Sequence, residues 1–269
     1  DDGTPCDLGG CRFNRPADRS DTYDNVSAQV GWIHDFSANN QVYVNLAQAF
    51  RAPETNEVYR LQSNQNVADL DSEEARSIEA GWRGRIAASN INYAIAAFYM
   101  TKDNVIFQDS NRENHSGAET KHRGIEWNLA WQFNDAWRLG VNGAYARHTY
   151  EGTLNPGPVN LDGLDIDTAP RVTGGAQLLW QIAAGHELEL EGVYMGKYFA
   201  DEANTVEYPG HKLLNLRYRG SLGQHWYYGA RITNLLDVDY AERADVGFGN
   251  ERYFVGEPAS LYLNIGYRL

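Results

Sequence analysis

The stretch Gly124–Tyr145 reads GIEWNLAWQFNDAWRLGVNGAY, and it decides the fold class. Large apolar residues alternate with polar or small ones up to Asn134-Asp135, and the alternation resumes after this pair. A period of two predicts β-strands, because successive side chains point to opposite faces. Asn-Asp suits a tight hairpin turn. Strands of about 9–11 residues with one aromatic apolar face and one polar face are typical of transmembrane β-barrels.

The composition agrees with a barrel and disfavours other classes. The chain has 269 residues, of which 12% are aromatic, and a formal net charge of -13. This acidic balance argues against a nucleic-acid partner, which would need a basic surface. No run approaches the roughly 18 apolar residues of a spanning helix. The acidic start Asp1-Asp2-Gly3 does not resemble a signal peptide, so we expect a processed chain or a piece of a longer one.

Similar alternation continues along the chain and predicts an all-β, antiparallel transmembrane barrel with about eleven strands. Short turns alternate with long polar loops, which is the asymmetry of outer-membrane barrels. Single-chain bacterial barrels have an even strand number, so eleven indicates a fragment or one further strand. The long loops are expected at residues 51–71, 108–118, 151–169, 201–208 and 236–249.

The two strand faces carry different residue types. Aromatic residues near the short turns are expected to form an interfacial girdle: Trp32, Phe36, Phe133, Trp137, Trp180 and Trp226. Charged residues on the opposite face are expected to line a polar lumen, where they pair with one another or with a plug domain: Glu79, Arg83, Arg85, Glu126, Arg138, Glu187, Glu189, Glu191, Arg217, Arg219 and Arg231.

The two cysteines lie close together in PCDLGGC, as Cys6 and Cys11. Gly9-Gly10 lets the chain double back, so a local disulfide is feasible. A disulfide indicates an oxidising compartment such as the periplasm or cell surface. Free thiols or a metal site are the alternatives, although no histidine lies nearby. We expect residues 1–21 to form an extracellular loop with this disulfide, and residues 22–269 to form the strands.

The predicted outer loops carry candidate catalytic and metal-binding residues. His115, His122 and His148 lie near acidic residues, and a His–acid pair can act as a general base. No spacing singles out a nucleophile, so we expect no catalytic residue and no enzyme. The acidic segments Asp69–Glu74 and Asp162–Asp167 could bind Ca²⁺, but neither has EF-hand spacing. We therefore expect solvated loops, no metal site and no cofactor.

Five segments, in this order along the chain, carry a resemblance to a known family. They are Phe50-Arg51-Ala52-Pro53-Glu54 with Asn56-Glu57-Val58-Tyr59, Asp71-Ser72-Glu73 with Ile78-Glu79-Ala80-Gly81, Gly124-Ile125-Glu126, Asn234-Leu235-Leu236-Asp237 with Tyr240, and Gly256-Glu257-Pro258. Together they resemble motifs in the barrel of TonB-dependent outer-membrane receptors. Ala259 stands where the family often has Arg, and Leu269 replaces the usual terminal Phe.

The resemblance implies a 22-stranded barrel in the outer membrane of a Gram-negative bacterium, with this chain as its C-terminal half. It implies outer-membrane lipid, a plug domain of the same receptor and TonB, reached through the N-terminal part, as partners. The implied function is active import of a scarce nutrient, with a ferric siderophore or other iron chelate as the default. Residues expected near that ligand, on the extracellular side, are Arg51, Tyr59, His115, His122, Tyr150, Tyr198, Tyr240 and Phe248.

Two alternatives remain open at the level of sequence. A smaller outer-membrane barrel acting as a hydrolase or passive porin would close with ten or twelve strands and would have no plug. A secreted adhesin or other sheet-rich binding module would be soluble without detergent. The outward Trp and Leu residues argue against the latter, because they would form a large exposed apolar patch.

Overall fold

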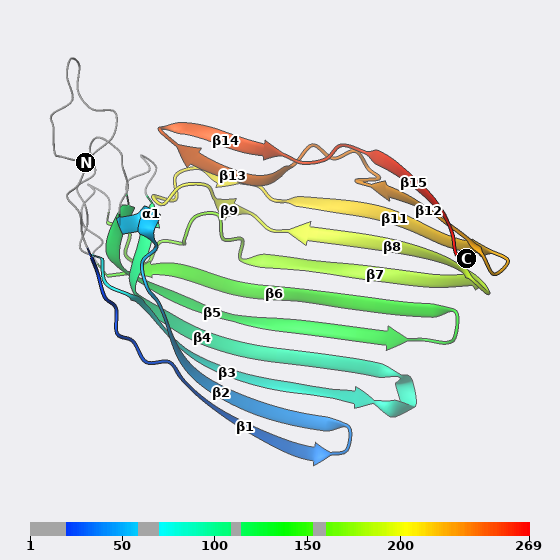
Figure 1. Ribbon diagram of the computed structural model, residues 1–269, viewed down its shortest axis with the longest axis horizontal. Coiled ribbons are helices and arrows are strands. Elements are labelled where there is room, and N and C mark those ends of the chain that lie inside the picture. The colour runs from blue at the N-terminus through cyan, green and yellow to red at the C-terminus, as the bar shows by residue number, and fades with distance from the viewer. Residues whose placement is uncertain (1–19, 59–69, 109–113, 153–159) are drawn as a thin grey trace.

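The computed structural model describes residues 20–58, 70–108, 114–152 and 160–269. Eleven strands lie side by side in one curved antiparallel sheet, in the order β1-β2-β3-β4-β5-β6-β7-β8-β11-β12-β15 (Figure 1). They are β1 (Ala28–Ser37), β2 (Asn40–Arg51), β3 (Glu73–Ile86), β4 (Ile91–Gln108), β5 (Asn114–Gln132), β6 (Trp137–Glu151), β7 (Val172–Ala183), β8 (His186–Met195), β11 (His211–Leu222), β12 (Trp226–Thr233) and β15 (Ser260–Tyr267).

Smaller elements complete the described part of the chain. Two hairpin-like pairs lie beside the sheet: β9 (Tyr198–Phe199) with β10 (Glu207–Tyr208), and β13 (Ala241–Gly247) with β14 (Asn250–Val255). The helical pieces are α1 (Thr55–Val58) and the 3₁₀ turn η1 (Ala87–Ser89). Within the described residues, no helix is both long and apolar enough to span a bilayer.

The short connections gather at one end of the sheet and the long ones at the other (Figure 1). At the β5–β6 turn, the Asn134 side-chain oxygen accepts the backbone N–H groups of Ala136 at 2.8 Å and Trp137 at 3.0 Å. This is the local hydrogen bonding for which Asn is favoured in turns. The predicted hairpin at Asn134-Asp135 and the predicted asymmetry of the connections are therefore confirmed.

The strand register places the apolar side chains on the outer face. Trp127 pairs with Gly143, and Trp131 pairs with Leu139, on the same side of the sheet. Near the short turns, Trp137 stacks on Trp180 with ring centroids 5.2 Å apart. Large apolar side chains on this face remain solvent-accessible in the isolated chain, which is the state expected of a lipid-facing surface.

The outer face also marks where the bilayer ends on the side of the long loops. Towards the long loops, the next outward residue after Ile125 on β5 is Arg123. On β6, the next outward residue after Tyr145 is Arg147. On β3 the same change runs from Ile78 to Arg76. A charged side chain facing lipid is destabilising, so the hydrocarbon region ends below these arginines. Residues beyond them belong to the extracellular part.

The inner face is polar, and its charges pair with one another across strands. The Arg217 guanidinium donates to the Glu189 carboxylate at 2.7 Å. The Glu191 carboxylate accepts the side-chain amides of Gln177 at 2.9 Å and Asn215 at 3.0 Å. Cross-strand pairing offsets the cost of placing these charges away from bulk water. The structure thus places the predicted lumen residues of these strands together on one face.

The sheet does not close on itself. β1 and β15 are its two edges, and each pairs with one neighbour among the described strands. Backbone N–H and C=O groups inside a bilayer must all be hydrogen-bonded, so a membrane sheet cannot keep open edges. Further strands must complete this barrel. The open sheet fits the predicted half of a larger barrel and argues against a complete small barrel.

Three loop predictions were wrong in extent. Residues 201–208 were expected to be a loop, yet the last two of them form β10, which pairs with β9. Residues 236–249 were expected to be a loop, yet they contain β13, which pairs with β14. Residues 108–118 were expected to be a loop, yet β5 already begins at Asn114 and pairs with β4 there. Residues 114–118 are polar and lack the alternation that identified the membrane strands. β13 buries Ala241 and Ala244 against Tyr198 and Tyr208, which are distant in the sequence, so its local sequence does not indicate this packing.

The two faces can be separated by adjacent substitutions on β7. We expect Leu178→Arg to destabilise the protein by about 2–4 kcal/mol, because outward Leu178 lies between Leu139 and Leu190 in the lipid-facing band. The matched control, Gln177→Arg, places the same charge beside Glu191 on the inner face and should cost far less. Reversible unfolding in lipid vesicles measures both. Equal losses would contradict the assignment of the faces.

Candidate ligand-binding face

Arg51 at the end of β2 joins two of the sequence motifs. Its guanidinium donates to both Glu73 oxygens at 2.8 Å and to the two Glu57 oxygens at 2.8 and 3.0 Å. Burial alone would raise the pKa of Glu73, but hydrogen bonds from Arg51 and from the Ile106 N–H outweigh it and lower that pKa. Arg51 is therefore a cross-link between α1, β2 and β3. Its donors are taken up by these carboxylates rather than directed at a ligand.

Asn234 connects the two motifs nearest the C-terminus, its own segment 234–240 and the segment 256–258. It is 2% exposed and has a left-handed backbone with φ of 49°. Its side-chain amide donates to the carbonyls of Val238 at 2.9 Å and Glu257 at 3.1 Å. The Tyr240 ring lies over Gly256 so closely that a Cβ there would sit 2.2 Å from a ring carbon. The two segments are thus one packed joint at the extracellular end of β12 and β15.

Two buried tyrosines fix the β13–β14 hairpin to the rest of the extracellular face. The Tyr198 hydroxyl accepts the Ala244 N–H at 2.7 Å, and the Tyr208 hydroxyl accepts the Ala241 N–H at 3.0 Å. Both rings are about 6% exposed and pack on these two alanines. Buried backbone groups need such partners. The hairpin is consequently held in one position rather than free.

The tip of this hairpin carries an exposed aromatic side chain on an unusual backbone. Phe248 and Gly249 form the two-residue turn, with φ of 53° and 72°. A type I′ turn needs positive φ at both positions, which suits Asn-Gly and is costly for a bulky residue. The Phe248 side chain is nevertheless 58% exposed. A strained, exposed aromatic at a loop tip is a candidate contact for a bulky ligand.

The loop before β7 is tied down by carboxylates. Asp165 is 8% exposed and accepts the Nε–H groups of Arg147 at 3.0 Å and Arg171 at 2.7 Å. The Tyr150 hydroxyl donates to Asp167 at 2.8 Å. Burial raises the pKa of both the Tyr150 hydroxyl and the Asp167 carboxyl. These acidic residues act as structural partners. Among the described residues, no group of three or more His, Cys, Asp or Glu side chains is placed to hold a metal ion.

His122 on β5 and His148 on β6 are directly paired across the strands. Their Nδ1 atoms lie 2.7 Å apart, and the His122 Nε2 lies 2.9 Å from the Thr120 hydroxyl. Both rings face the inner side, just beyond the level where Arg123 and Arg147 mark the end of the bilayer. They therefore lie at the outer mouth of the lumen.

Both imidazoles are held neutral by their surroundings. Burial lowers the pKa of His122, and His148 and Lys102 lower it further, to about 4. Burial also lowers the pKa of His148, against the opposing effect of Asp165. Neutral imidazoles keep a lone pair available to a hydrogen bond or to a metal ion.

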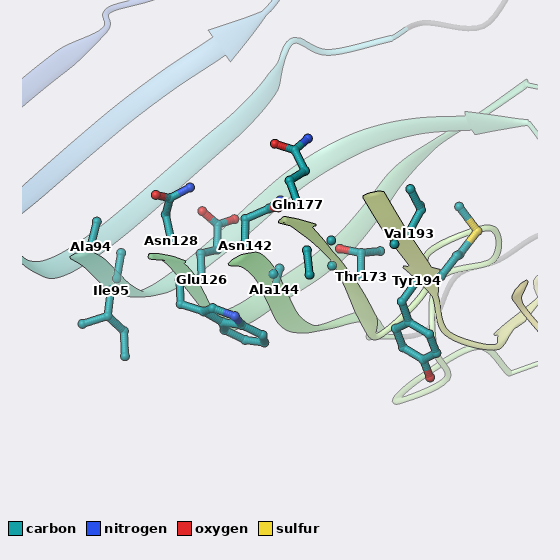
Figure 2. Close-up of a pocket in the computed structure, with 18 of the residues that line it drawn as sticks. Ala94, Ile95, Glu126, Asn128, Asn142, Ala144, Thr173, Gln177, Val193 and Tyr194 are labelled. Carbon is teal, nitrogen blue, oxygen red and sulfur yellow. The ribbon is translucent and has the colours of Figure 1, made fainter. Parts of the chain in front are cut away.

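Below the mouth, the inner face is hollowed around its smallest residues. A hollow of about 750 Å³ is lined on the inner side by Ala144, Thr173 and Val193, with polar Asn128 and Gln177 at its edge. Figure 2 shows Asn128 and Gln177 on one side of the sheet and Ile95 and Tyr194 on the other. The small side chains leave room here for further polypeptide or solute against the lumen wall.

Comparison with known proteins identifies the family. The family model for the TonB-dependent receptor-like β-barrel matches residues 6–235. This chain belongs to the TonB-dependent receptor β-barrel family. Members are outer-membrane transport receptors, so the predicted fold, location and absence of an enzymatic role are confirmed at the level of the family.

Relatives agree with this assignment. The metal-pseudopaline receptor CntO of Pseudomonas aeruginosa is 25% identical over 203 residues, which are 73% of this chain and 28% of that protein. The probable TonB-dependent siderophore receptor PiuA of Acinetobacter baumannii is 24% identical over 234 residues, or 82% and 31%. The chain thus spans less than a third of these curated relatives.

Solved structures share the fold. The ferric yersiniabactin uptake receptor FyuA from Yersinia pestis superposes with a TM-score of 0.74 and 15% identity, over 90% of this chain and 37% of that one. The copper transporter OprC superposes with a TM-score of 0.69 and 14% identity, over 90% and 39%. At these sequence identities, the structural similarity supports the fold alone.

The predicted ligand residues fall into three groups. Arg51, Tyr150 and Tyr198 take part in the packing described above, and their contact with a ligand stays a prediction. His122, Tyr240 and Phe248 lie on the extracellular side, with Phe248 the most exposed. Tyr59, Cys6 and Cys11, together with the His115 side chain, lie outside the described residues. Their assignments, including the disulfide and the loop at residues 1–21, stay predictions.

From the sequence, His148 was named only as a possible general base near acidic residues, and both His148 and Tyr208 were left out of the expected ligand contacts. The pairing of His148 with His122 emerges only from the β5–β6 register. Equal spacing from the Asn134-Asp135 turn could have revealed it, because both histidines lie at comparable distances from that turn. Tyr208 contacts β13 over a separation of 33 residues, and nothing local in the sequence indicates it.

The histidine pair should make the stability of the extracellular end depend on pH. Since the folded pKa of His122 lies near 4 and the unfolded one near 6.5, the unfolded state binds more protons between these values. The stability contributed by the neutral pair is complete above pH 6.5 and is lost as the pH falls towards 4. We expect amide exchange at the outer ends of β5 and β6 to accelerate over this window. His122→Asn should flatten the response. An unchanged profile in that variant would contradict the prediction.

Proposed function

We propose that the receptor containing this chain imports a metal chelate, with a ferric siderophore as the substrate class, across the outer membrane. The observation that carries this proposal is the family match over residues 6–235. The relatives support it through their names, which concern metal-pseudopaline, a siderophore, ferric yersiniabactin and copper. Uptake of a bound metal is the common element.

Transport of this kind needs a driving force and a barrier, which we assign to TonB and to a plug domain outside this chain. The polar, internally paired inner face supports a plug, because it can hold another folded unit without burying unpaired charges. The hollow beside Asn128 and Gln177 offers room for such a unit. A passive porin would have no need of either partner.

The extracellular hairpins form the ligand face in this proposal. They are ordered by buried tyrosines and carboxylates, so the exposed side chains at their tips are held in fixed positions. Phe248 supplies apolar aromatic surface of the kind that contacts bulky small molecules. Preorganised surface of this kind binds at a lower entropic cost than a free loop.

Uptake by intact cells tests the proposed function. A strain that lacks the full-length receptor should lose accumulation of iron supplied as its ferric chelate under iron limitation, and the restored gene should return it. A strain that lacks TonB should behave like the receptor deletion, because the transport is energised. Undiminished accumulation in both strains, across a panel of ferric siderophores, would contradict the proposal. Accumulation lost only in the receptor strain would indicate a passive pore.

The tip residue can be tested without disturbing the fold. Phe248→Asn creates Asn-Gly, the preferred type I′ pair, so stability should be unchanged or higher. Loss of the aromatic contact should weaken chelate binding to the full-length receptor on the order of tenfold or more. Phe248→Tyr keeps the ring and should retain affinity. Titration of the purified receptor measures both variants, and equal affinities for Asn and Tyr would remove Phe248 from the ligand face.

A further inference from the structure

We propose that His122 and His148 form a two-imidazole site for a divalent first-row transition metal ion, such as Ni²⁺, Cu²⁺ or Zn²⁺, at the outer mouth of the lumen. The site goes beyond the proposed import of a ferric chelate, and it would bind the metal alone. The two residues meet through the β5–β6 register, and both rings face the same side of the sheet.

The geometry of the pair is close to that of two ligands sharing one metal. The two Nδ1 atoms are 2.7 Å apart. Two imidazole nitrogens at about 2.0–2.1 Å from a tetrahedral metal lie roughly 3.3 Å from each other. A small rotation of the rings therefore opens the pair enough to replace the shared proton with a metal ion. Placement on two paired strands keeps this rearrangement small.

Thr120 orients the first ring. Its hydroxyl lies 2.9 Å from the His122 Nε2, and the residue is only 4% exposed. When the hydroxyl accepts the Nε2–H, the lone pair of His122 is left on Nδ1, the atom that faces His148. Metal-binding histidines are commonly fixed in this way by a hydrogen bond from the other ring nitrogen.

A soft ligand lies next in the same row. Met100 on β4 occupies the register position opposite His122, on the inner side of the sheet. Thioether sulfur favours copper over harder ions, whereas imidazole suits Zn²⁺, Cu²⁺ and Ni²⁺ alike. The row Met100–His122–His148 thus favours late transition metals over Mg²⁺ or Ca²⁺.

The electrostatic setting also permits binding of a cation. The charged groups that act on the pair are Lys102 from β4, which disfavours a cation, and Asp165 from the loop before β7, which favours one. Both histidines are partly buried and lie on the inner face, where their ring nitrogens converge. Two protein ligands leave coordination positions open, to be filled by water or by a chelate carried with the metal.

Calorimetric titration of the full-length receptor, purified without a polyhistidine tag, tests the site with NiCl₂, CuCl₂ and ZnCl₂. We expect one site per receptor that requires both rings, with at least tenfold weaker binding in His148→Ala. The matched control is His34→Ala, which removes an exposed histidine on β1 at the opposite end of the sheet and should leave binding unchanged. Bound Cu²⁺ should show two nitrogen ligands in its electron paramagnetic resonance spectrum.

Two further variants keep the test decisive. If His148→Ala fails to fold, Thr120→Val should weaken binding of all three ions by about 10–100-fold. Met100→Leu should weaken Cu²⁺ more than Zn²⁺. Absence of metal binding, or binding that is equal in the native receptor and in both His148→Ala and Thr120→Val, would overturn the proposal. Metal binding in a receptor that imports no ferric chelate would sustain this site and refute the proposed function instead.

Discussion

Every backbone N–H and C=O group that crosses a bilayer must find its partner within the protein, and the whole structure follows from this requirement. It dictates that each spanning segment be a strand with two neighbours, so the eleven-stranded sheet with its open edges at β1 and β15 is part of a larger closed surface. Side chains are then free to differ by face, apolar outside and polar inside.

Beyond the bilayer the same requirement is met by side chains instead of strands. Tyr198 and Tyr208 satisfy the backbone of β13, and Asn234 satisfies carbonyls from two separate segments. Arg51 forms ion pairs with two carboxylates from different elements. Most of the sequence motifs that mark the family therefore hold the extracellular end together. In this chain these segments act as packing joints, and their contacts do not depend on a particular ligand.

The strands and their faces were predictable because period-two alternation is a local property of the sequence. Gly124–Tyr145 shows it well: the turn, the outward tryptophans and the inward polar residues all lie where the alternation puts them. The extracellular hairpin β13–β14 escaped prediction because its strands are short and β13 packs on Tyr198 and Tyr208, contacts that no local pattern reveals. Tyr150 and Tyr198 were predicted as ligand contacts beside Phe248, and a sequence does not reveal that their rings are buried whereas the Phe248 ring is exposed. Only the tertiary contacts separate them from Phe248.

Once the packed residues are set aside, little functional chemistry remains unassigned on the described extracellular face, and it is of two kinds. Phe248 offers an exposed aromatic ring at the tip of an anchored hairpin, which suits the organic part of a ligand. His122 and His148 offer nitrogen lone pairs at the mouth of the lumen, which suit a metal ion. A receptor with both can hold a metal and its organic carrier through separate contacts. Selectivity would then depend on the metal as well as on the shape of the chelate, because only incompletely wrapped ions can reach the imidazoles.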